Sequence, residues 1–255
     1  MKKHRVLALV LALTMTAALF LAGCGKKAET PTQGNAQAEQ SGEKLDADQT
    51  MRIIGYDYKS LDTVAESDAE TFTTYNQVFE GLAREAPDHK IVLAGADSMD
   101  ISKDGLVYTF KLKKDAKWSD GKPVTAKDYE FAWKRLINPD NAFDYMQFLY
   151  MIKNVPEYQD KKAKIEDVGI KAVDDYTFEV TLSTPTPFFP NMLAFGALVP
   201  EREDVFNALG KDYGQSWDKL VYNGPFTISE YQKGSKIVYK KNPNYWDAKN
   251  VKLEK

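Results

Sequence analysis

The distribution of aromatic residues confines the folded part of this chain. All but one of its Phe, Tyr and Trp residues follow position 50, and Phe20 is the exception. Residues 25–50 contain no aromatic residue, and Leu45 is their single large aliphatic side chain. Such a stretch cannot bury enough apolar surface to offset the entropy lost on ordering. We therefore expect residues 24–50 to form a flexible tether and the fold to begin near Met51.

The beginning of the chain has the pattern of an export signal. Three basic residues within the first five positions precede an uncharged apolar run over residues 6–22. A membrane-spanning helix is the alternative, but this run is near the lower limit for crossing about 30 Å of hydrocarbon. The tetrapeptide Leu-Ala-Gly-Cys that ends at Cys24 resembles the bacterial lipobox. That resemblance implies a lipoprotein signal peptide over residues 1–23 and a lipid on Cys24 that holds the protein at the extracytoplasmic face of a membrane.

Charge and composition exclude several classes of function. Residues 1–23 hold three basic residues and no acid, so the rest of the chain has 31 basic and 37 acidic side chains, a net charge of −6. This balance argues against nucleic acid as a partner, because phosphates require clustered Lys and Arg. Cys24 is the single cysteine, and His89 is the single histidine beyond the signal. We therefore expect no disulfide framework, no metal site and no cofactor.

The sequence lacks the common catalytic motifs. It contains no GxSxG, no HExxH and no glycine-rich phosphate loop. The neighbouring carboxylates of Asp174 and Asp175 fit a hairpin turn better than an acid–base pair. We predict that the protein is not an enzyme. A lipid-tethered surface protein that serves as a scaffold or in adhesion is a further alternative that composition leaves open.

Hydrophobic periodicity predicts a mixed α/β fold. Thr125 is the expected N-cap of a helix that begins at Ala126, with Asp128 at the capping-box position. Helices are predicted over residues 69–83, 126–137, 141–151 and 201–209, and a strand over 51–56. Three hairpins are predicted, which pair residues 97–101 with 106–112, 168–173 with 176–182, and 226–231 with 236–240.

Seven short motifs carry a family likeness along residues 51–255. Most also have a structural reading as turns, caps or chain breakers. The motifs are Ser60-Leu61-Asp62, Val78-Phe79-Glu80-Gly81-Leu82, residues 118–128, residues 168–175, Pro187-Phe188-Phe189, Asn223-Gly224-Pro225-Phe226 and Asn242-Pro243-Asn244-Tyr245-Trp246. In this order and at these spacings the chain resembles the oligopeptide-binding proteins of ABC importers, within the family 5 extracellular solute-binding proteins of the peptide/nickel type.

The resemblance implies a two-lobed periplasmic-binding-protein fold of class II that encloses its ligand. It implies a discontinuous first lobe, residues 51–80 and 201–255, and a smaller inserted domain, residues 81–200. Peptide would be held mainly through its backbone, as an added strand, which permits sequence-tolerant recognition. The implied partners are an oligopeptide and the membrane subunits of an ABC transporter, and the protein is expected to be a monomer.

The resemblance also implies four peptide-binding residues. Ser67, Asp68 and Ala69 match the stretch that runs beside the peptide backbone, and Tyr145 matches a tyrosine of the inserted domain that faces the ligand. Many relatives carry an acid at the position of Ser67. The alternatives from the residues themselves are a helix-start charge for Asp68 and a buried core aromatic for Tyr145.

Family members are considerably longer than 255 residues, and this difference leads to two further expectations. The chain is expected to be a truncated form or fragment that lacks the second lobe. It is then expected to bind peptide weakly or not at all, because part of the contact surface would be missing. The same fold carries nickel chelates, haem and small oligosaccharides in other members, so these stay open as alternative cargo.

Overall fold

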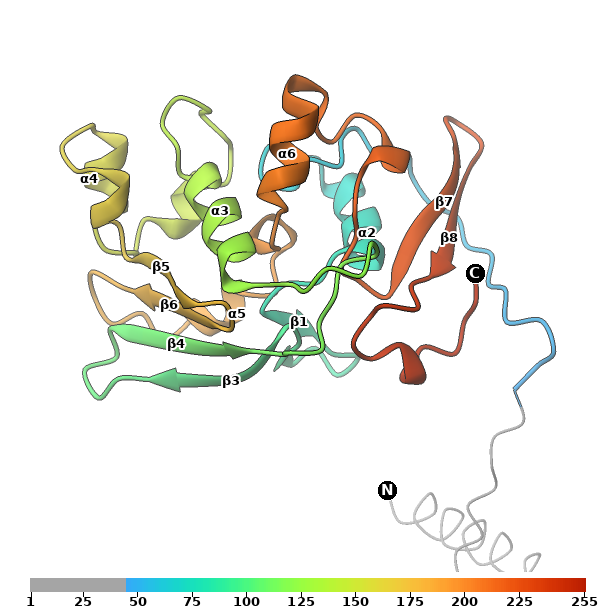
Figure 1. Ribbon diagram of the computed structural model, residues 1–255, viewed down its shortest axis with the longest axis horizontal. Helices are drawn as coiled ribbons and strands as arrows, with labels where there is room; N and C mark the ends of the chain where they lie inside the picture. The colour runs from blue at the N-terminus through green and yellow to red at the C-terminus, as the bar shows by residue number, and fades with distance from the viewer. Residues whose placement is uncertain (1–44) are drawn as a thin grey trace, which may run out of the picture. The chain divides into compact units, whose positions relative to one another are not determined.

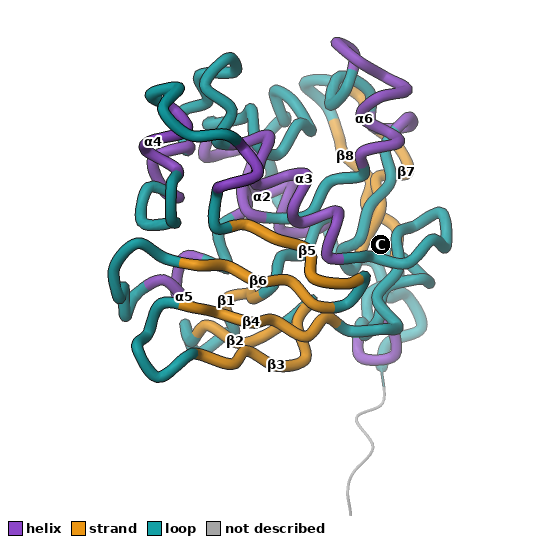
Figure 2. The backbone as a smooth tube through the Cα atoms, turned by 60° about the vertical axis from the view of Figure 1, so that its left-hand side comes forward, coloured by secondary structure: helices purple, strands orange, loops and turns teal. Residues whose placement is uncertain are grey.

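Four strands form an antiparallel sheet in the order β3-β4-β6-β5 (Figure 2). The computed structural model of the protein describes residues 45–255. The strands are β3 (Ala96–Ile101), β4 (Val107–Leu112), β5 (Ile170–Asp174) and β6 (Thr177–Thr181). Two predicted hairpins, β3 with β4 and β5 with β6, are confirmed, and pairing of β4 with β6 joins them.

Helix α3 (Ala126–Leu136) covers one face of this sheet (Figure 1). Phe110 of β4 lies opposite Phe178 of β6, and both side chains are fully buried. Trp133 of α3 stands edge-on to Phe178, with the ring centroids 5.2 Å apart. Burial of one such side chain contributes about 1.5–3 kcal/mol. The alternating apolar positions of the strands and the apolar stripe of the helix therefore hold these two layers together.

The predicted capping box fixes the start of α3. The backbone N–H of Thr125 donates to the carboxylate of Asp128 at 2.8 Å, and the indole N–H of Trp118 donates to the same carboxylate at 3.2 Å. Trp118 is 1% exposed. The motif over residues 118–128 thus packs a ring beneath the helix start and caps the helix, which is the structural reading of that motif.

A separate hairpin packs against the helix that begins at Ala69. The hairpin consists of β7 (Phe226–Gln232) and β8 (Lys236–Lys241), which confirms the third prediction, and the helix is α2 (Ala69–Val78). Figure 1 shows this hairpin in red-orange, beside α2. The hydroxyl of Thr74 on α2 lies 2.8 Å from that of Tyr239 on β8.

Buried apolar residues of the described chain gather in two clusters. The sheet core contains Phe110, Trp133 and Phe178, and all but one of its members lie between residues 82 and 198. The hairpin core contains Tyr75 and Ile228, and its members lie within residues 58–79 and 199–228. The bounds predicted for the two domains stay a prediction.

Short elements connect the larger ones. They include β1 (Ala83–Glu85) paired with β2 (Ile91–Leu93), α4 (Val155–Gln159), α5 (Phe189–Met192) and α6 (Glu203–Leu209). Single 3₁₀ turns are η2 (Met146–Leu149), η3 (Ile165–Asp167), η4 (Gly196–Leu198), η5 (Gly210–Asp212), η6 (Trp217–Lys219) and η7 (Ala248–Asn250).

Three predicted elements are wrong or shortened. Residues 51–56 form no strand, and Ile54 within them is 98% exposed. A strand needs a partner for its ladder of hydrogen bonds, and β-forming composition does not supply one. The helix predicted over 69–83 ends at Val78. The helix predicted over 141–151 is reduced to η2, and Ala142 before it has a left-handed φ of 49°, which no helix tolerates.

One buried hydroxyl of the sheet core leads to a testable prediction. The hydroxyl of Tyr129 is buried and has no hydrogen-bond partner among the described residues. An unpaired buried polar group costs about 1–3 kcal/mol. Tyr129→Phe is therefore expected to raise the free energy of unfolding by about 1 kcal/mol in urea titrations. A loss of stability of that size would show that the hydroxyl has a partner.

The predicted signal peptide and lipid anchor of the protein lie outside the described residues. These begin at position 45, so the signal peptide 1–23, Cys24 and most of the tether 24–50 precede them. Between residues 45 and 255, no helix combines the length and the apolar character needed to cross a membrane.

Candidate functional site

Three of the predicted site residues lie at the start of α2. Asp68 is the N-cap, and its carboxylate accepts the backbone N–H of Thr71 at 3.1 Å and pairs with the ammonium of Lys59 at 2.6 Å. The hydrogen bond from Lys59 is the main cause that lowers the pKa of Asp68. The Asp68 side chain is therefore engaged within the protein, whereas Ser67 and Ala69 are exposed.

The structure brings the fourth predicted residue to the same corner. The hydroxyl of Tyr145 donates to the backbone carbonyl of Ser67 over 3.4 Å, although the two residues are 78 positions apart. The carboxylate of Glu66 accepts the backbone N–H groups of Ser67 and Asp68 at 2.9 and 2.8 Å, which holds this turn in place. Tyr145 is partly exposed rather than fully buried. We call residues 66–69 with Tyr145 the Ser67 corner.

Three aromatic residues lie beside this corner, and they were not assigned to the site from the sequence. Phe195 lies 4.7 Å from Tyr145, 5.1 Å from Phe72 and 5.0 Å from Phe148, measured between ring centroids. All four rings are partly exposed. The i, i+3 spacing of Tyr145 and Phe148 was a signal that both face the same way. No local pattern places Phe72 or Phe195, because they reach the corner from distant segments.

The connection between the two cores is held by side chains of the family motifs. The amide of Asn223 accepts the backbone N–H of Glu80 at 3.1 Å and donates to its carbonyl at 2.7 Å. The carboxylate of Glu80 accepts hydrogen bonds from Tyr245, Trp246 and Arg84. Burial raises the pKa of Glu80. These contacts draw residues 79–82 away from α2 and explain why that helix ends at Val78.

A buried group of three charges lies where these segments meet. The guanidinium of Arg135 on α3 binds Asp62 at 2.7 Å and Glu201 at 3.0 Å. The Glu201 side chain is 1% exposed and also accepts the hydroxyl of Thr63 at 2.9 Å. The ring of Phe206 stacks 4.4 Å from the guanidinium carbon of Arg135. One cation thus serves two carboxylates in a site with little water.

Because these charges are buried, we expect the free energy of unfolding of the protein to depend on pH. Burial, with Asp62 as a nearby negative charge, raises the pKa of Glu201 from 4.5 to about 7, although Arg135 opposes the shift. Because the folded protein holds this proton more tightly than the unfolded chain, Glu201 stabilises the fold at low pH. This contribution is lost as the pH rises from about 4.5 to about 7. Tyr213, which faces the group, stays neutral in this range because burial raises its pKa.

Thermal unfolding at several pH values checks the prediction. The melting temperature of the protein should fall from about pH 5 to about pH 7.5, and in Glu201→Gln this part of the slope should vanish. Equal slopes in the two proteins would contradict the role given to Glu201.

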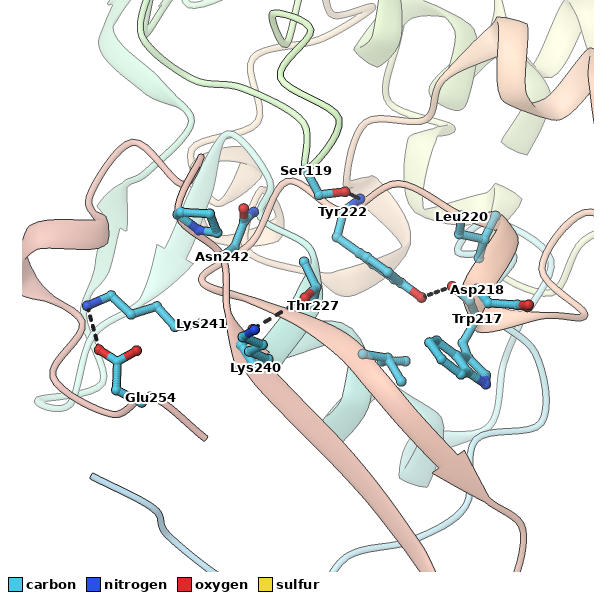
Figure 3. A pocket seen from close by; sticks show the side chains of 12 residues that line it. Ser119, Trp217, Asp218, Leu220, Tyr222, Thr227, Lys240, Lys241, Asn242 and Glu254 are labelled. Carbon is cyan, nitrogen blue, oxygen red and sulfur yellow. Dashed lines mark hydrogen bonds and ion pairs between the residues drawn. The ribbon is translucent and has the colours of Figure 1, made fainter. Parts of the chain in front are cut away.

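A pocket of about 660 Å³ lies beside the β7–β8 hairpin (Figure 3). Within it Lys241 pairs with Glu254 at 3.2 Å, and the hydroxyl of Tyr222 donates to the carbonyl of Trp217 at 2.6 Å. None of the four predicted peptide-binding residues lines this pocket, so it is distinct from the Ser67 corner. The lining residues are Ser119, Trp217, Asp218, Leu220, Tyr222, Thr227, Ile228, Lys240, Lys241, Asn242, Pro243 and Glu254.

Metal-ligating side chains do not converge in the part of the chain that the structure describes. Among residues 45–255, no three His, Cys, Asp or Glu side chains are arranged to hold a metal ion. The Ser67 corner instead presents a backbone carbonyl and the phenol of Tyr145, and partly exposed aromatic rings lie beside it. Such groups can bind an amide backbone and an apolar side chain by hydrogen bonding and contact.

Comparison with known proteins identifies the family. Residues 90–255 match the family described as bacterial extracellular solute-binding proteins, family 5 Middle. The chain belongs to this family. Its relatives of known function are solute-binding proteins rather than enzymes. The oligopeptide-binding protein OppA of Bacillus subtilis is 34% identical over 255 residues, which cover 100% of this chain and 45% of OppA.

Solved structures of family 5 relatives confirm the mixed α/β fold. The substrate-binding domain of an oligopeptide ABC transporter from Bacillus anthracis superposes with a TM-score of 0.80 at 39% identity, covering 83% of this chain and 41% of that one. Listeria monocytogenes OppA bound to peptide gives a TM-score of 0.78 at 39% identity, covering 82% and 42%. The chain therefore spans less than half the length of these relatives.

Proposed function

We propose that this protein captures oligopeptides for an ABC importer and that the Ser67 corner forms part of its peptide site. The observation that carries the proposal is the hydrogen bond from Tyr145 to the Ser67 carbonyl, which joins two distant segments that the family likeness had linked to peptide. Relatives named as oligopeptide-binding proteins, one of them solved with peptide bound, support the choice of cargo.

The two cores support a division of the chain into two parts. The hairpin core draws its residues from segments 58–79 and 199–228, as a discontinuous first lobe over 51–80 and 201–255 requires. The sheet core lies almost entirely within the proposed inserted domain, 81–200. The Ser67 corner draws on both parts, because α2 belongs to the first and Tyr145 to the second.

Lipid on Cys24 anchors the protein at the extracytoplasmic face of the membrane. The basic start, the apolar run and the lipobox-like tetrapeptide support this part of the proposal. The monomer then delivers peptide to the membrane subunits of the transporter. In cells that export the protein, Cys24→Ser should move it from the membrane to the soluble fraction and abolish labelling by palmitate. Unchanged membrane association of this variant would refute the anchor.

Substitution of Tyr145 tests the peptide site. Tyr145→Ala removes both the ring and the hydroxyl, and it should weaken binding of a labelled tripeptide at least tenfold in equilibrium dialysis. Tyr145→Phe keeps the ring and should weaken binding less. Tyr150, which is 43% exposed and five positions further on, supplies the control Tyr150→Ala. Equal affinity of the Tyr145→Ala variant and the unmodified chain would exclude this residue from the site.

A further inference from the structure

The rings of Phe72, Tyr145, Phe148 and Phe195, which we call the ring cluster, lie across the seam between the two cores. Phe72 packs against the hairpin core, whereas Tyr145 and Phe195 pack against the sheet core. Phe72 also contacts Tyr145 directly, with the centroids 5.8 Å apart. A fully buried cluster would be part of a core, but each of these rings keeps part of its surface exposed.

The position of η4 fixes one side of this cluster. A Cβ atom added to Gly196 would lie 2.6 Å from the ring of Phe72, so the backbone of η4 rests directly on that ring. This contact sets Phe195, the residue before η4, against Phe72. The four rings therefore form a positioned wall rather than a set of independent surface side chains.

From this arrangement we infer that the ring cluster is a subsite that holds one apolar side chain, preferably aromatic, of the bound peptide. The inference rests on the proposed peptide-binding function. Aromatic rings offer a large contact area with little loss of rotamer freedom, and ring pairs add to the gain from burial. The wall is continuous with the Ser67 corner through Tyr145, whose hydroxyl contacts the Ser67 carbonyl.

The negative charge beside the ring cluster favours a peptide as the molecule that binds there. Glu66, Asp68 and Glu70 bring three carboxylates to the start of α2, and Lys59 pairs with only one of them, Asp68. A peptide with a free amino terminus carries a positive charge, which complements this acidic edge, together with side chains for the apolar wall. A second copy of this chain would present further negative net charge, and it is the less favoured occupant.

Three tripeptides of equal length test the inference on the unmodified chain. Ala-Phe-Ala, Ala-Ala-Ala and Ala-Glu-Ala are titrated into the labelled protein, and their affinities are read from NMR shifts. We expect Ala-Phe-Ala to bind about tenfold more tightly than Ala-Ala-Ala, and Ala-Glu-Ala to bind most weakly. Equal affinities for the three peptides would overturn the subsite and leave the proposed function intact.

Substitution at Phe148 localises the preference. This ring contacts Tyr145 and Phe195 but belongs to neither core, so its removal is the least disruptive in the cluster. In Phe148→Ala the preference for Ala-Phe-Ala over Ala-Ala-Ala should fall from about tenfold to less than threefold. Phe188→Ala, at an aromatic residue that is 57% exposed and outside the cluster, should keep the full preference.

Other outcomes of these titrations also decide between the occupants. A tenfold preference that survives in Phe148→Ala, with the fold verified by circular dichroism, would place the subsite elsewhere and overturn the inference. Shifts of the ring cluster that depend on protein concentration without peptide would identify a second copy as its occupant and overturn it as well. The absence of shifts with every peptide would overturn the proposed function and the subsite together.

Discussion

Replacement of Arg135 by methionine should lower the free energy of unfolding by about 3–5 kcal/mol at neutral pH. Among residues 45–255, Arg135 is the single cation paired with the buried carboxylates of Asp62 and Glu201. Without it, Asp62 would lack its counter-charge in a site of low polarity, and Glu201 would have to bind a proton or carry an uncompensated charge. Urea unfolding followed by circular dichroism measures the loss.

Neighbouring substitutions separate this effect from simple loss of a charge. Lys134→Met removes a cation from the adjacent position of α3, where Lys134 pairs with Glu130 and each of the two side chains is 26% exposed. It should change stability by less than about 1 kcal/mol. Adding Glu201→Gln to Arg135→Met should restore part of the loss, because the amide beside Asp62 needs neither a counter-charge nor a proton. A cost below about 1 kcal/mol for Arg135→Met alone would contradict the account of this group.

Gly224→Ala should be the second severe substitution, with a cost of about 3 kcal/mol. A Cβ at this position would lie 2.5 Å from the carbonyl carbon of Val78 and 2.7 Å from the backbone nitrogen of Phe79. Backbone atoms cannot move aside as a side-chain tip can, and the hydrogen bond from Gly224 N–H to the Val78 carbonyl, at 2.9 Å, would be strained as well. The contact joins the end of α2 to the segment before β7.

A glycine in open space provides the matched control for Gly224→Ala. A Cβ at Gly55 would meet no atom within 4 Å, so Gly55→Ala should change the free energy of unfolding by less than about 1 kcal/mol. Both variants are compared in the same urea titration. Similar stabilities for the two would show that the close approach at Gly224 can relax, and would weaken the view that this segment is rigidly joined to α2.

Local sequence patterns predicted those elements of the fold whose contacts join residues close to one another in the sequence. The three hairpins follow from alternation around turn residues, and α3 follows from its capping box and apolar stripe. Residues 51–56 have the composition of a strand but no ladder partner in the described chain, so the same kind of pattern failed there. The end of α2 at Val78 was missed because the cause, Asn223, lies 145 positions away.

The candidate site was predictable only where a family likeness supplied long-range information. Ser67 and Tyr145 were each assigned to the peptide site by resemblance, and the structure brings them to one corner. Phe72 and Phe195 had no local signal, since each looks like an ordinary apolar residue until the chain folds. The same holds for Arg135, whose partners lie 73 and 66 positions away.

Mapping of a bound peptide on the protein by NMR decides whether the Ser67 corner binds peptide. NMR spectra of the isotope-labelled protein are recorded during titration with tri-alanine, and shifts of backbone amides and of the Tyr145 side chain are followed. We expect residues 67–69 and Tyr145 to shift together with a single dissociation constant of about 0.1–1 mM. Shifts confined to the residues that line the pocket beside β7 and β8, or no shifts at about 10 mM peptide, would contradict this expectation.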